Sequence, residues 1–293
     1  MNKRRILFII NPISGGRDKS KMADLIHSHL DKNYFDIDIK YTEYMGHGAE
    51  IAKKYHAKNN VVVAVGGDGT INEIAKEIAG TEAVLGIIPQ GSGNGLARHL
   101  NWDLDPKKAI TQMNAAEVRA IDTAELNGHF FVSIAGIGFD SLIAEKFAHS
   151  KNRGFMGYAS LSTKEFFKYQ EQEYDLLIDG QKFKRKAAMI SIANSNQFGY
   201  NTKISPLASL CDGLLDVCIL RKPKLGEVPK VLSKVWRAKA HKSNLIEIIR
   251  GKKVKISPND HEYANVDGES INVGKEIEII IKPRNLKIWL PKV

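Results

Sequence analysis

Three apolar runs in the first hundred residues are each followed by a glycine-rich loop, and this repeated pairing constrains the fold most strongly. Continuous apolar runs of this length are typical of strands buried on both faces, as in a parallel sheet. Because open parallel sheets bind ligands beyond the carboxyl ends of their strands, the three loops predict one shared anion site. The runs cover residues 6–10, 61–65 and 84–88, and the loops cover 11–16, 66–70 and 89–94.

The chain alternates strand and helix patterns up to about residue 115. Apolar residues recur at helical spacing from Met22 and again from Ile71, and a strand is indicated at 35–41. A further helix is expected near 48–57. This repetition predicts an α/β N-terminal domain, doubly wound around a mainly parallel sheet.

From about residue 118 onward, short strand patterns dominate. The dipeptides Asn127-Gly128 and Asp179-Gly180 each join two such patterns as a hairpin. An all-β second domain, sandwich or barrel, follows from this, with separate strands at 277–281 and 286–290 and a single helix at 228–236.

The length of 293 residues is sufficient for two domains with separate cores. We place the α/β domain at 1–120 and the β-sandwich domain at 121–281, with a strand at about 282–293 as a candidate to return to the first domain. The apolar runs are too short to cross a bilayer. The first of them stops at Asn11-Pro12, which favours a strand over a signal peptide.

Charge and cysteine content narrow the surroundings of the chain. Cys211 and Cys218 show neither a disulfide framework nor paired metal spacing, so we expect a cytoplasmic protein, with possible contact at the inner membrane surface. The formal net charge of +10 calls for an anionic partner. Ten Lys or Arg face only two Glu within 224–255, which favours an acidic membrane surface. No aromatic–basic platform for nucleic acid is evident, and the oligomeric state is left open.

The helix expected at 228–236 has two interpretations. Its apolar stripe, which includes Trp236, fits a membrane-facing amphipathic helix with Lys230, Lys234 and Arg237 on lipid phosphates. The same stripe fits equally well a helix that packs on the second domain.

The second loop, Gly66-Gly67-Asp68-Gly69-Thr70, carries the most specific chemistry. Its glycines let the backbone approach phosphate oxygens, and the helix that follows presents unpaired N–H groups and a partial positive charge. A carboxylate beside phosphate is repulsive. Asp68 therefore indicates either an intervening Mg²⁺ or a proton acceptor for a substrate hydroxyl.

The other motifs are weaker when taken singly. The first and third loops consist of residues that are common in any loop, and the chain lacks the Gly-Lys-Ser/Thr sequence that ends a Walker A motif. Asp-Gly occurs at Asp68, Asp179, Asp212 and Asp267, and Asp179 reads fully as a hairpin turn. The dipeptide alone therefore does not mark a site, although Asp212 and Asp267 have further acids nearby.

Taken in order, the motifs resemble the diacylglycerol kinase catalytic family, which includes diacylglycerol, sphingosine and ceramide kinases and small bacterial lipid kinases. The matching elements are Asn-Pro-x-Ser-Gly, Gly-Gly-Asp-Gly-Thr-x-Asn-Glu, Gly-Ser-Gly-Asn, Ala-Gly-Ile-Gly-Phe-Asp, Asp-Gly-Leu-Leu-Asp and Val-Asp-Gly-Glu. They extend from Asn11 to about Glu269, nearly the whole chain.

The resemblance implies a phosphofructokinase- and NAD-kinase-like N-terminal domain, a β-sandwich second domain that carries lipid and metal, and ATP between them. It also implies a set of nucleotide-binding positions, most of which lie in the three glycine-rich loops. These positions are Asn11, Pro12, Ile13, Ser14, Gly15, Thr42, Gly66, Gly67, Asp68, Gly69, Thr70, Ile71, Asn72 and Ser92.

The resemblance implies a Mg²⁺ site and a general base as well. The metal ligands would be Asp212 with main-chain oxygens of Ser209 and Leu214. The base would be Asp68, Asp267 or Glu269.

One departure bears on the substrate. Many bacterial diacylglycerol-type members have Gly-Thr-x-Asn-Asp at the third loop, whereas this chain has Gly-Ser-Gly-Asn-Gly. This form looks closer to the sphingoid-base and ceramide branch and weakens the case for diacylglycerol.

We therefore expect an ATP-dependent lipid kinase that transfers the γ-phosphoryl group to a lipid hydroxyl, with Mg²⁺. The acceptor is of the diacylglycerol or sphingoid type. The alternatives are an NAD kinase-like enzyme and a non-catalytic nucleotide- or lipid-binding regulator.

Overall fold

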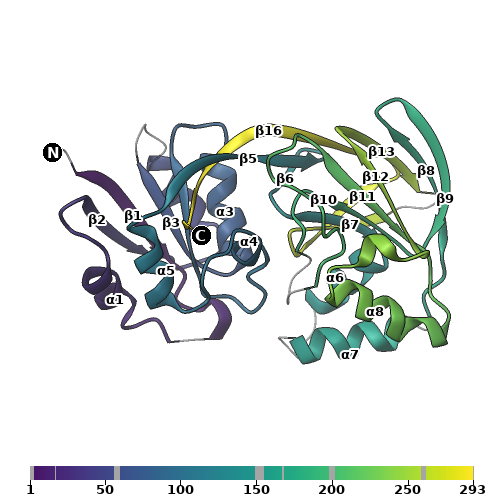
Figure 1. The fold of residues 1–293 in the computed structure, drawn as a ribbon, viewed down its shortest axis with the longest axis horizontal. Coiled ribbons are helices and arrows are strands. Elements are labelled where there is room, and N and C mark those ends of the chain that lie inside the picture. Colours follow the sequence, from purple (N-terminus) through teal and green to yellow (C-terminus); the bar gives the residue numbers. More distant parts are fainter. Residues whose placement is uncertain are drawn as a thin grey trace. The chain divides into compact units, whose positions relative to one another are not determined.

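The computed structural model describes residues 3–16, 18–55, 60–148, 155–166, 168–197, 202–258 and 262–292. The chain forms two compact units (Figure 1). The first comprises Met1–Asp122 and Arg284–Val293, and the second comprises Thr123–Pro283. The strands β5 (Glu117–Leu126) and β16 (Ile277–Leu290) each continue from one unit into the other.

The first unit is built on a parallel sheet with the strand order β2-β1-β3-β4. Every residue of β3 and β4 is buried, and successive residues of a strand point to opposite faces, so both faces of the sheet are covered. The end of β16 adds to this sheet in parallel to β4. The strands are β1 (Arg4–Ile10), β2 (Phe35–Tyr41), β3 (Val61–Gly66) and β4 (Val84–Pro89).

The helices of the first unit follow the carboxyl ends of these strands. In α3 the apolar residues at helical spacing, Ile71, Ile74 and Ile78, are buried. The helix α5 begins after Asp105, whose carboxylate accepts a hydrogen bond from the backbone N–H of Lys108 at 3.1 Å. The helices are α1 (Met22–His29), α2 (His47–Ala52), α3 (Asp68–Ile78), α4 (Gly95–His99) and α5 (Pro106–Met113), with 3₁₀ turns at Ser14–Gly16 and Lys53–Tyr55.

The predicted α/β domain with mainly parallel strands is therefore confirmed. The helix expected near 48–57 is α2 continued by the 3₁₀ turn Lys53–Tyr55, and residues 56 and 57 lie outside the described residues.

The second unit is an antiparallel β-sandwich. One layer has the order β12-β11-β10-β7-β14-β15, and the other includes β9, β8, β13 and the first part of β16. Alternate residues of the two layers, such as Ile137, Ile190, Leu176 and Ile256, meet in one core. The strands are β6 (His129–Phe131), β7 (Ile134–Gly138), β8 (Gln172–Ile178), β9 (Gln181–Ala187), β10 (Met189–Ala193), β11 (Leu215–Leu220), β12 (Ile246–Gly251), β13 (Lys253–Pro258), β14 (Glu262–Val266) and β15 (Glu269–Gly274).

The sandwich and both predicted hairpin turns are confirmed, since Asn127-Gly128 joins β5 to β6 and Asp179-Gly180 joins β8 to β9. The expectation of a single helix in this unit is wrong. In addition to α8 (Val228–Trp236) the unit contains α6 (Phe139–Ala148) and α7 (Phe155–Phe166), with 3₁₀ turns at Leu225–Glu227 and Ala240–Lys242.

The sequence did not predict α6 because this helix buries polar side chains. Asp140 and Ser141 are both 2% exposed and occupy its first turn, directly after a strand that ends in glycine. In the sequence this combination has the appearance of a loop.

The expectation of two separate strands at 277–281 and 286–290 is also wrong, because β16 runs without interruption from Ile277 to Leu290. Pro283 lacks an N–H group, and Arg284 has a positive φ of 52°. Both are typical of a turn. Here the backbone N–H of Arg284 donates to the carboxylate of the buried Asp122 at 2.8 Å, which lets the strand continue.

No helix in the described part of the chain combines the length and the apolar character that a membrane crossing requires.

Candidate active site

The three glycine-rich loops begin at one edge of the parallel sheet. The backbone N–H of Asn11 donates to the carbonyl of Val65 at 3.0 Å, and that of Gln90 donates to the carbonyl of Gly66 at 2.7 Å. Thr42 directly follows β2, and its N–H donates to the carbonyl of Ile10 at 2.9 Å. The carboxyl ends of β1, β2, β3 and β4 are therefore neighbours, as the sequence predicts for a shared site.

Side chains join the first loop to the other two. The amide of Asn11 donates from Nδ2 to Thr70 Oγ1 at 3.0 Å, while its Oδ1 accepts from the N–H of Ile13 at 3.1 Å. The Ser14 hydroxyl lies 3.2 Å from the Asn11 carbonyl and 3.5 Å from the Gln90 carbonyl. Asn11 and Ser14 are thus held in place before any ligand binds.

Glycine is required where the loops touch. A Cβ on Gly91 would lie 2.4 Å from the Cα of Gly67, which no side chain can tolerate. A Cβ on Gly15 would lie 2.3 Å from the carbonyl oxygen of Gln90, and Gly15 also has a positive φ of 64°. Backbone-to-backbone contact between the loops therefore explains these three glycines, independently of any phosphate.

The start of α3 provides hydrogen-bond donors for an anion. Its N-cap residue, Gly67, has no side chain, and the first helical hydrogen bond runs from Ile71 N–H to the Gly67 carbonyl at 3.0 Å. The N–H groups of the preceding residues in the first turn, including Gly69 and Thr70, consequently have no partner within the helix. Nothing lies within 4 Å of a Cβ built on Gly69, so a ligand can approach the backbone there.

Asp68 links the second loop to the third. Its Oδ1 accepts a hydrogen bond from the N–H of Gly95, the first residue of α4, at 2.8 Å. Burial raises the pKa of Asp68 above its ordinary value, and hydrogen bonds from the backbone N–H groups of Gly95, Asn94 and Leu96 act in the opposite direction. The carboxyl group is therefore both a clamp between two loops and a better proton acceptor than a solvated aspartate.

The remaining predicted nucleotide positions differ in what they offer. Pro12, Ile13 and Ser92 are exposed at the loop surfaces, and Asn72 is half-buried on α3. The side chain of Ile71 is 2% exposed and belongs to the core of the unit, so only its backbone could meet a ligand.

Two basic residues that the sequence analysis does not single out donate hydrogen bonds to carbonyl groups of the loops. Lys19 is only 4% exposed, and its ammonium group donates to the Ser14 carbonyl at 2.5 Å. Arg98 donates from Nε to the Gly93 carbonyl at 3.1 Å. The signal for Lys19 was hidden because it stands in a short run of charged residues, which has the appearance of a solvated loop.

The late acids of the second unit have different surroundings. The carboxylate of Asp267 accepts hydrogen bonds from three consecutive backbone N–H groups, those of Val132 at 2.8 Å, Ser133 at 3.0 Å and Ile134 at 2.8 Å. Asp267 also has a positive φ of 47° in the turn between β14 and β15. Glu269, two residues later, is exposed. Asp267 is thus a clamp within the sandwich, while the carboxylate of Glu269 faces solvent.

The predicted metal ligands lie in one loop before β11. Asp212 is exposed, and its Oδ1 accepts from the N–H of Leu214 at 3.1 Å, while the Ser209 hydroxyl accepts from the N–H of Cys211 at 3.3 Å. A carboxylate together with two backbone carbonyls is an oxygen donor set that suits Mg²⁺ with several retained waters. The residues therefore fit the ion. Within the described residues, no group of three or more His, Cys, Asp or Glu side chains is suited to hold a metal, so a metal here depends on backbone oxygens.

The second aspartate of Asp-Gly-Leu-Leu-Asp braces this loop. Asp216 is 2% exposed and accepts from Arg250 Nε at 2.9 Å and from the Ser205 hydroxyl at 2.5 Å. Arg250 also donates from Nη2 to the Leu207 carbonyl at 3.1 Å. The ion pair between the exposed Arg250 and the buried Asp216 therefore fixes the segment that carries Asp212.

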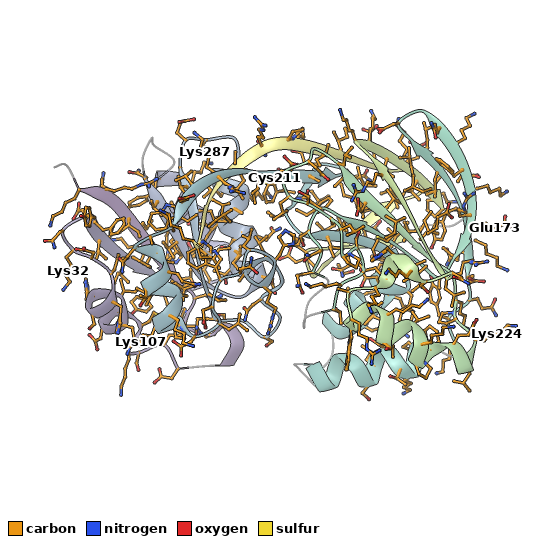
Figure 2. The ribbon with its side chains drawn as sticks, in the orientation of Figure 1. Lys32, Lys107, Glu173, Cys211, Lys224 and Lys287 are labelled. Carbon is orange, nitrogen blue, oxygen red and sulfur yellow. The ribbon has the colours of Figure 1, made fainter. Side chains whose placement is uncertain are left out.

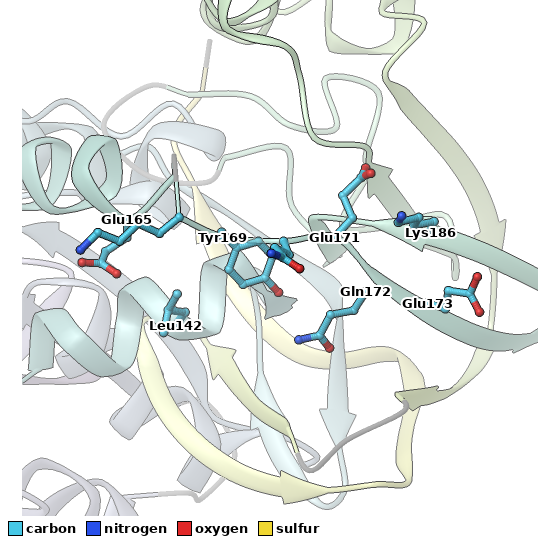
Figure 3. A pocket seen from close by; sticks show the side chains of 9 residues that line it. Leu142, Glu165, Tyr169, Glu171, Gln172, Glu173 and Lys186 are labelled. Carbon is cyan, nitrogen blue, oxygen red and sulfur yellow. The ribbon is translucent and has the colours of Figure 1, made fainter.

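A cavity of about 650 Å³ lies elsewhere in the second unit, between α6, the end of α7 and the strands β8 and β9 (Figure 3). Its charged groups are largely engaged, since Glu165 pairs with Lys146 and Glu171 accepts from the N–H of Lys222 at 2.6 Å. None of the predicted site residues lines it. The residues that line this cavity are Leu142, Glu165, Lys168, Tyr169, Gln170, Glu171, Gln172, Glu173 and Lys186.

Comparison with known proteins connects this geometry to a family. Residues 5–126 match the model of the diacylglycerol kinase catalytic domain, and residues 133–290 match that of the YegS C-terminal NAD kinase beta sandwich-like domain. A diacylglycerol kinase of Bacillus subtilis (strain 168) is 28% identical over 276 residues, which cover 92% of this chain and 90% of the relative. A protein of Pectobacterium atrosepticum named "Probable lipid kinase YegS-like" is 29% identical over 294 residues, covering 97% and 95%.

Solved structures show the same fold. The crystal structure of a diacylglycerol kinase from Bacillus anthracis str. Sterne superimposes with a TM-score of 0.75 at 18% sequence identity, covering 100% of this chain and 98% of the other. At this identity the likeness supports the fold alone.

Proposed function

Because this chain belongs to the diacylglycerol kinase catalytic family, we propose that it transfers the γ-phosphoryl group of ATP to a hydroxyl group of a lipid. The observation that carries the proposal is the convergence of three glycine-rich loops at one sheet edge, with hydrogen bonds and backbone contacts between them. Such an arrangement is suited to a polyphosphate, because it surrounds one point with backbone N–H groups.

The first unit would bind ATP through the backbone of its loops. The N–H groups at the start of α3 would donate to phosphate oxygens, and the partial positive charge of the helix end would oppose their charge. Catalysis of phosphoryl transfer consists mostly of positioning and charge stabilisation, so donors that are held rigidly contribute most. Asn11, Lys19 and Arg98 supply this rigidity through the contacts described above.

Mg²⁺, when bound, would neutralise charge on the phosphates. The residues suited to hold it are Asp212 with the carbonyls of Ser209 and Leu214, in the loop that Asp216 and Arg250 brace.

Removal of the proton from the lipid hydroxyl needs a general base. Asp68 and Asp267 both accept hydrogen bonds from backbone N–H groups, but burial raises the pKa of Asp68, which suits a base. Glu269 is exposed and free of such constraints. We therefore propose Asp68 as the first candidate and Glu269 as the second, with Asp267 as the residue that holds the turn next to Glu269.

The acceptor class is a diacylglycerol or sphingoid-type lipid. Such a lipid lies in a membrane, so a kinase meets it at a membrane surface, and the net charge of +10 supports peripheral contact with an anionic bilayer.

Incubation with γ-labelled ATP, Mg²⁺ and a total lipid extract tests the proposal. We expect label in one lipid product, which mass spectrometry then identifies. A parallel incubation with NAD in place of lipid tests the NAD kinase alternative suggested by the fold. ATP binding without phosphorylation of any lipid would instead indicate a regulator and contradict the proposed activity.

A further inference from the structure

The helix α8 has two apolar stripes, of which only one is used for packing. Val231 is 8% exposed and belongs to a core cluster of the second unit, and Val235 packs against that cluster. Leu232 and Trp236 are 54% and 64% exposed. Because these two residues are four positions apart, they share one face of the helix. Leu225, in the turn that precedes α8, is also exposed at 69%.

The same segment, residues 224–242, carries exposed basic residues without acidic partners. Five exposed basic residues form no ion pair with any residue that the structure describes. They are Lys224, which Figure 2 labels, Lys230, Arg237, Lys239 and Lys242. The acid of this segment, Glu227, accepts from the backbone N–H of Lys224 at 2.8 Å.

Several cations on the strands of the sandwich are paired. There, Lys253 and Lys255 both pair with Glu278, and Arg185 pairs with Glu247. Lys234 of α8 is likewise engaged, because its ammonium group donates to the carbonyl of Lys242 at 2.5 Å. Five cations without an ion pair therefore lie in the same segment, residues 224–242, as the exposed Leu225, Leu232 and Trp236.

We propose that these eight residues form a docking surface for a bilayer that contains anionic phospholipid. We call it the α8 surface, and it consists of Lys224, Leu225, Lys230, Leu232, Trp236, Arg237, Lys239 and Lys242. This inference deepens the proposed function, since it names the part of the chain that would bring a lipid kinase to its substrate.

A bilayer fits this surface better than a soluble anion does. Phosphate groups of lipid head groups would satisfy the five cations, and the acyl boundary would take up the leucine and tryptophan side chains. Tryptophan is suited to this boundary because it joins a large apolar ring to a polar N–H group. A nucleic acid or a free phosphate would satisfy the charges and leave Leu225 and Leu232 in water.

Tryptophan fluorescence can test the inference directly. Of the three tryptophans in the chain, Trp102 and Trp289 are 3% and 2% exposed, so a change of environment reports on Trp236. We expect vesicles of phosphatidylcholine with phosphatidylglycerol to shift the emission to shorter wavelength and to protect it from a soluble quencher. Vesicles of phosphatidylcholine alone should produce a much smaller shift.

Two double variants separate the contributions of charge and apolar contact. Lys230→Glu with Arg237→Glu should weaken binding to the anionic vesicles at least about twentyfold, because each cation near such a surface contributes about fivefold. Leu232→Ser with Trp236→Ser should weaken sedimentation with the same vesicles by about tenfold. Neither pair is in the core, so both variants should fold.

Lys32→Glu with Lys107→Glu is the matched control. Both residues are exposed, are labelled in Figure 2, and give the same change of net charge when reversed as the α8 pair does. We expect less than a threefold effect on vesicle binding. Equal losses in the control and in the α8 variants would overturn the inference, since they would indicate attraction by net charge alone, as would unchanged binding of the α8 variants.

The binding assay uses no ATP and no acceptor lipid, so its result does not depend on the proposed activity. In detergent-dispersed substrate, the α8 variants should retain wild-type turnover. Vesicle binding without any kinase activity would contradict the proposed function and leave the docking surface standing, and the reverse result would contradict only the docking surface.

Discussion

The loops of the first unit and the acidic turns of the second unit both match motifs of one family, yet the two regions use these residues differently. In the first unit, Asn11, Thr70 and Asp68 tie three loops together while the start of α3 keeps its donors available. In the second unit, the carboxylate of Asp267 accepts hydrogen bonds from backbone N–H groups, and that of Asp216 pairs with Arg250. A motif acid can therefore serve the fold of the site rather than its chemistry.

The contact between loops is the feature whose loss should have the largest effect. Gly91→Ala places a Cβ 2.4 Å from the Cα of Gly67 and must force the second and third loops apart. A displacement of about 1 Å in such a site costs about a hundredfold in turnover, so we expect at least that loss in a lipid kinase assay.

Gly226→Ala is the control for that variant, because a Cβ built there meets nothing within 4 Å. It should retain wild-type activity. Full activity of Gly91→Ala would show that the loops need not touch.

Asp68 tests whether a residue of the first region is a clamp or a base. Asp68→Ala should reduce turnover by a factor of about 10² to 10⁴, since it removes both the proton acceptor and the hydrogen bond to Gly95. Asp68→Asn keeps an oxygen for the Gly95 N–H and removes only the basicity. We expect the asparagine variant to be as inactive as the alanine variant in steady-state kinetics. Recovery of most activity in Asp68→Asn would assign Asp68 to positioning alone.

Asp267 should affect stability more than Glu269 does. Asp267→Asn replaces one carboxylate oxygen by an amide that cannot accept hydrogen bonds, so we expect a loss of roughly 2–3 kcal/mol in the free energy of unfolding. Glu269→Gln, at an exposed position, should leave stability unchanged in urea titration. Equal stability of the two variants would contradict the clamp that we assign to Asp267.

The smallest expected effect is on the pH dependence of stability. Burial raises the pKa of Asp68 in the folded state, so the folded protein holds this proton more tightly than the unfolded chain does. The stabilising contribution of Asp68 is fully present below the unfolded pKa of about 3.9 and is lost as pH rises through the raised folded value. Relative to Asp68→Asn, the wild type should therefore lose stability on going from pH 4 to pH 7 in urea titrations. A difference that is independent of pH would contradict the raised pKa.

The sequence predicted the parts of the fold that burial dictates. Residues 6–10 of β1, 61–65 of β3 and 84–88 of β4 form continuous runs without polar side chains because both faces of the sheet are covered there, and such a run has few other interpretations. Residues whose partners lie far away in the chain were not predictable. Arg284 continues β16 through a hydrogen bond to Asp122, and Asp140 is buried at the start of α6.

The residue types of the candidate site were predictable from the sequence, but the contacts that these residues make were less so. Glycines in three loops indicated phosphate binding, but part of their necessity comes from contacts such as Gly67 with Gly91. Nothing near Asp267 in the sequence indicates that three N–H groups of residues 132–134 take up its carboxylate. The roles of Asp68, Asp267, Glu269 and Asp212 in the reaction stay predictions.

Amide hydrogen exchange with and without a non-hydrolysable ATP analogue and Mg²⁺ tests the central claim most directly. If the three loops hold the phosphates together, amides of residues 11–16, 66–72 and 90–95 should gain protection in the same titration and with the same midpoint. Binding of the analogue with protection of only one loop, or of none, would contradict the shared phosphate site.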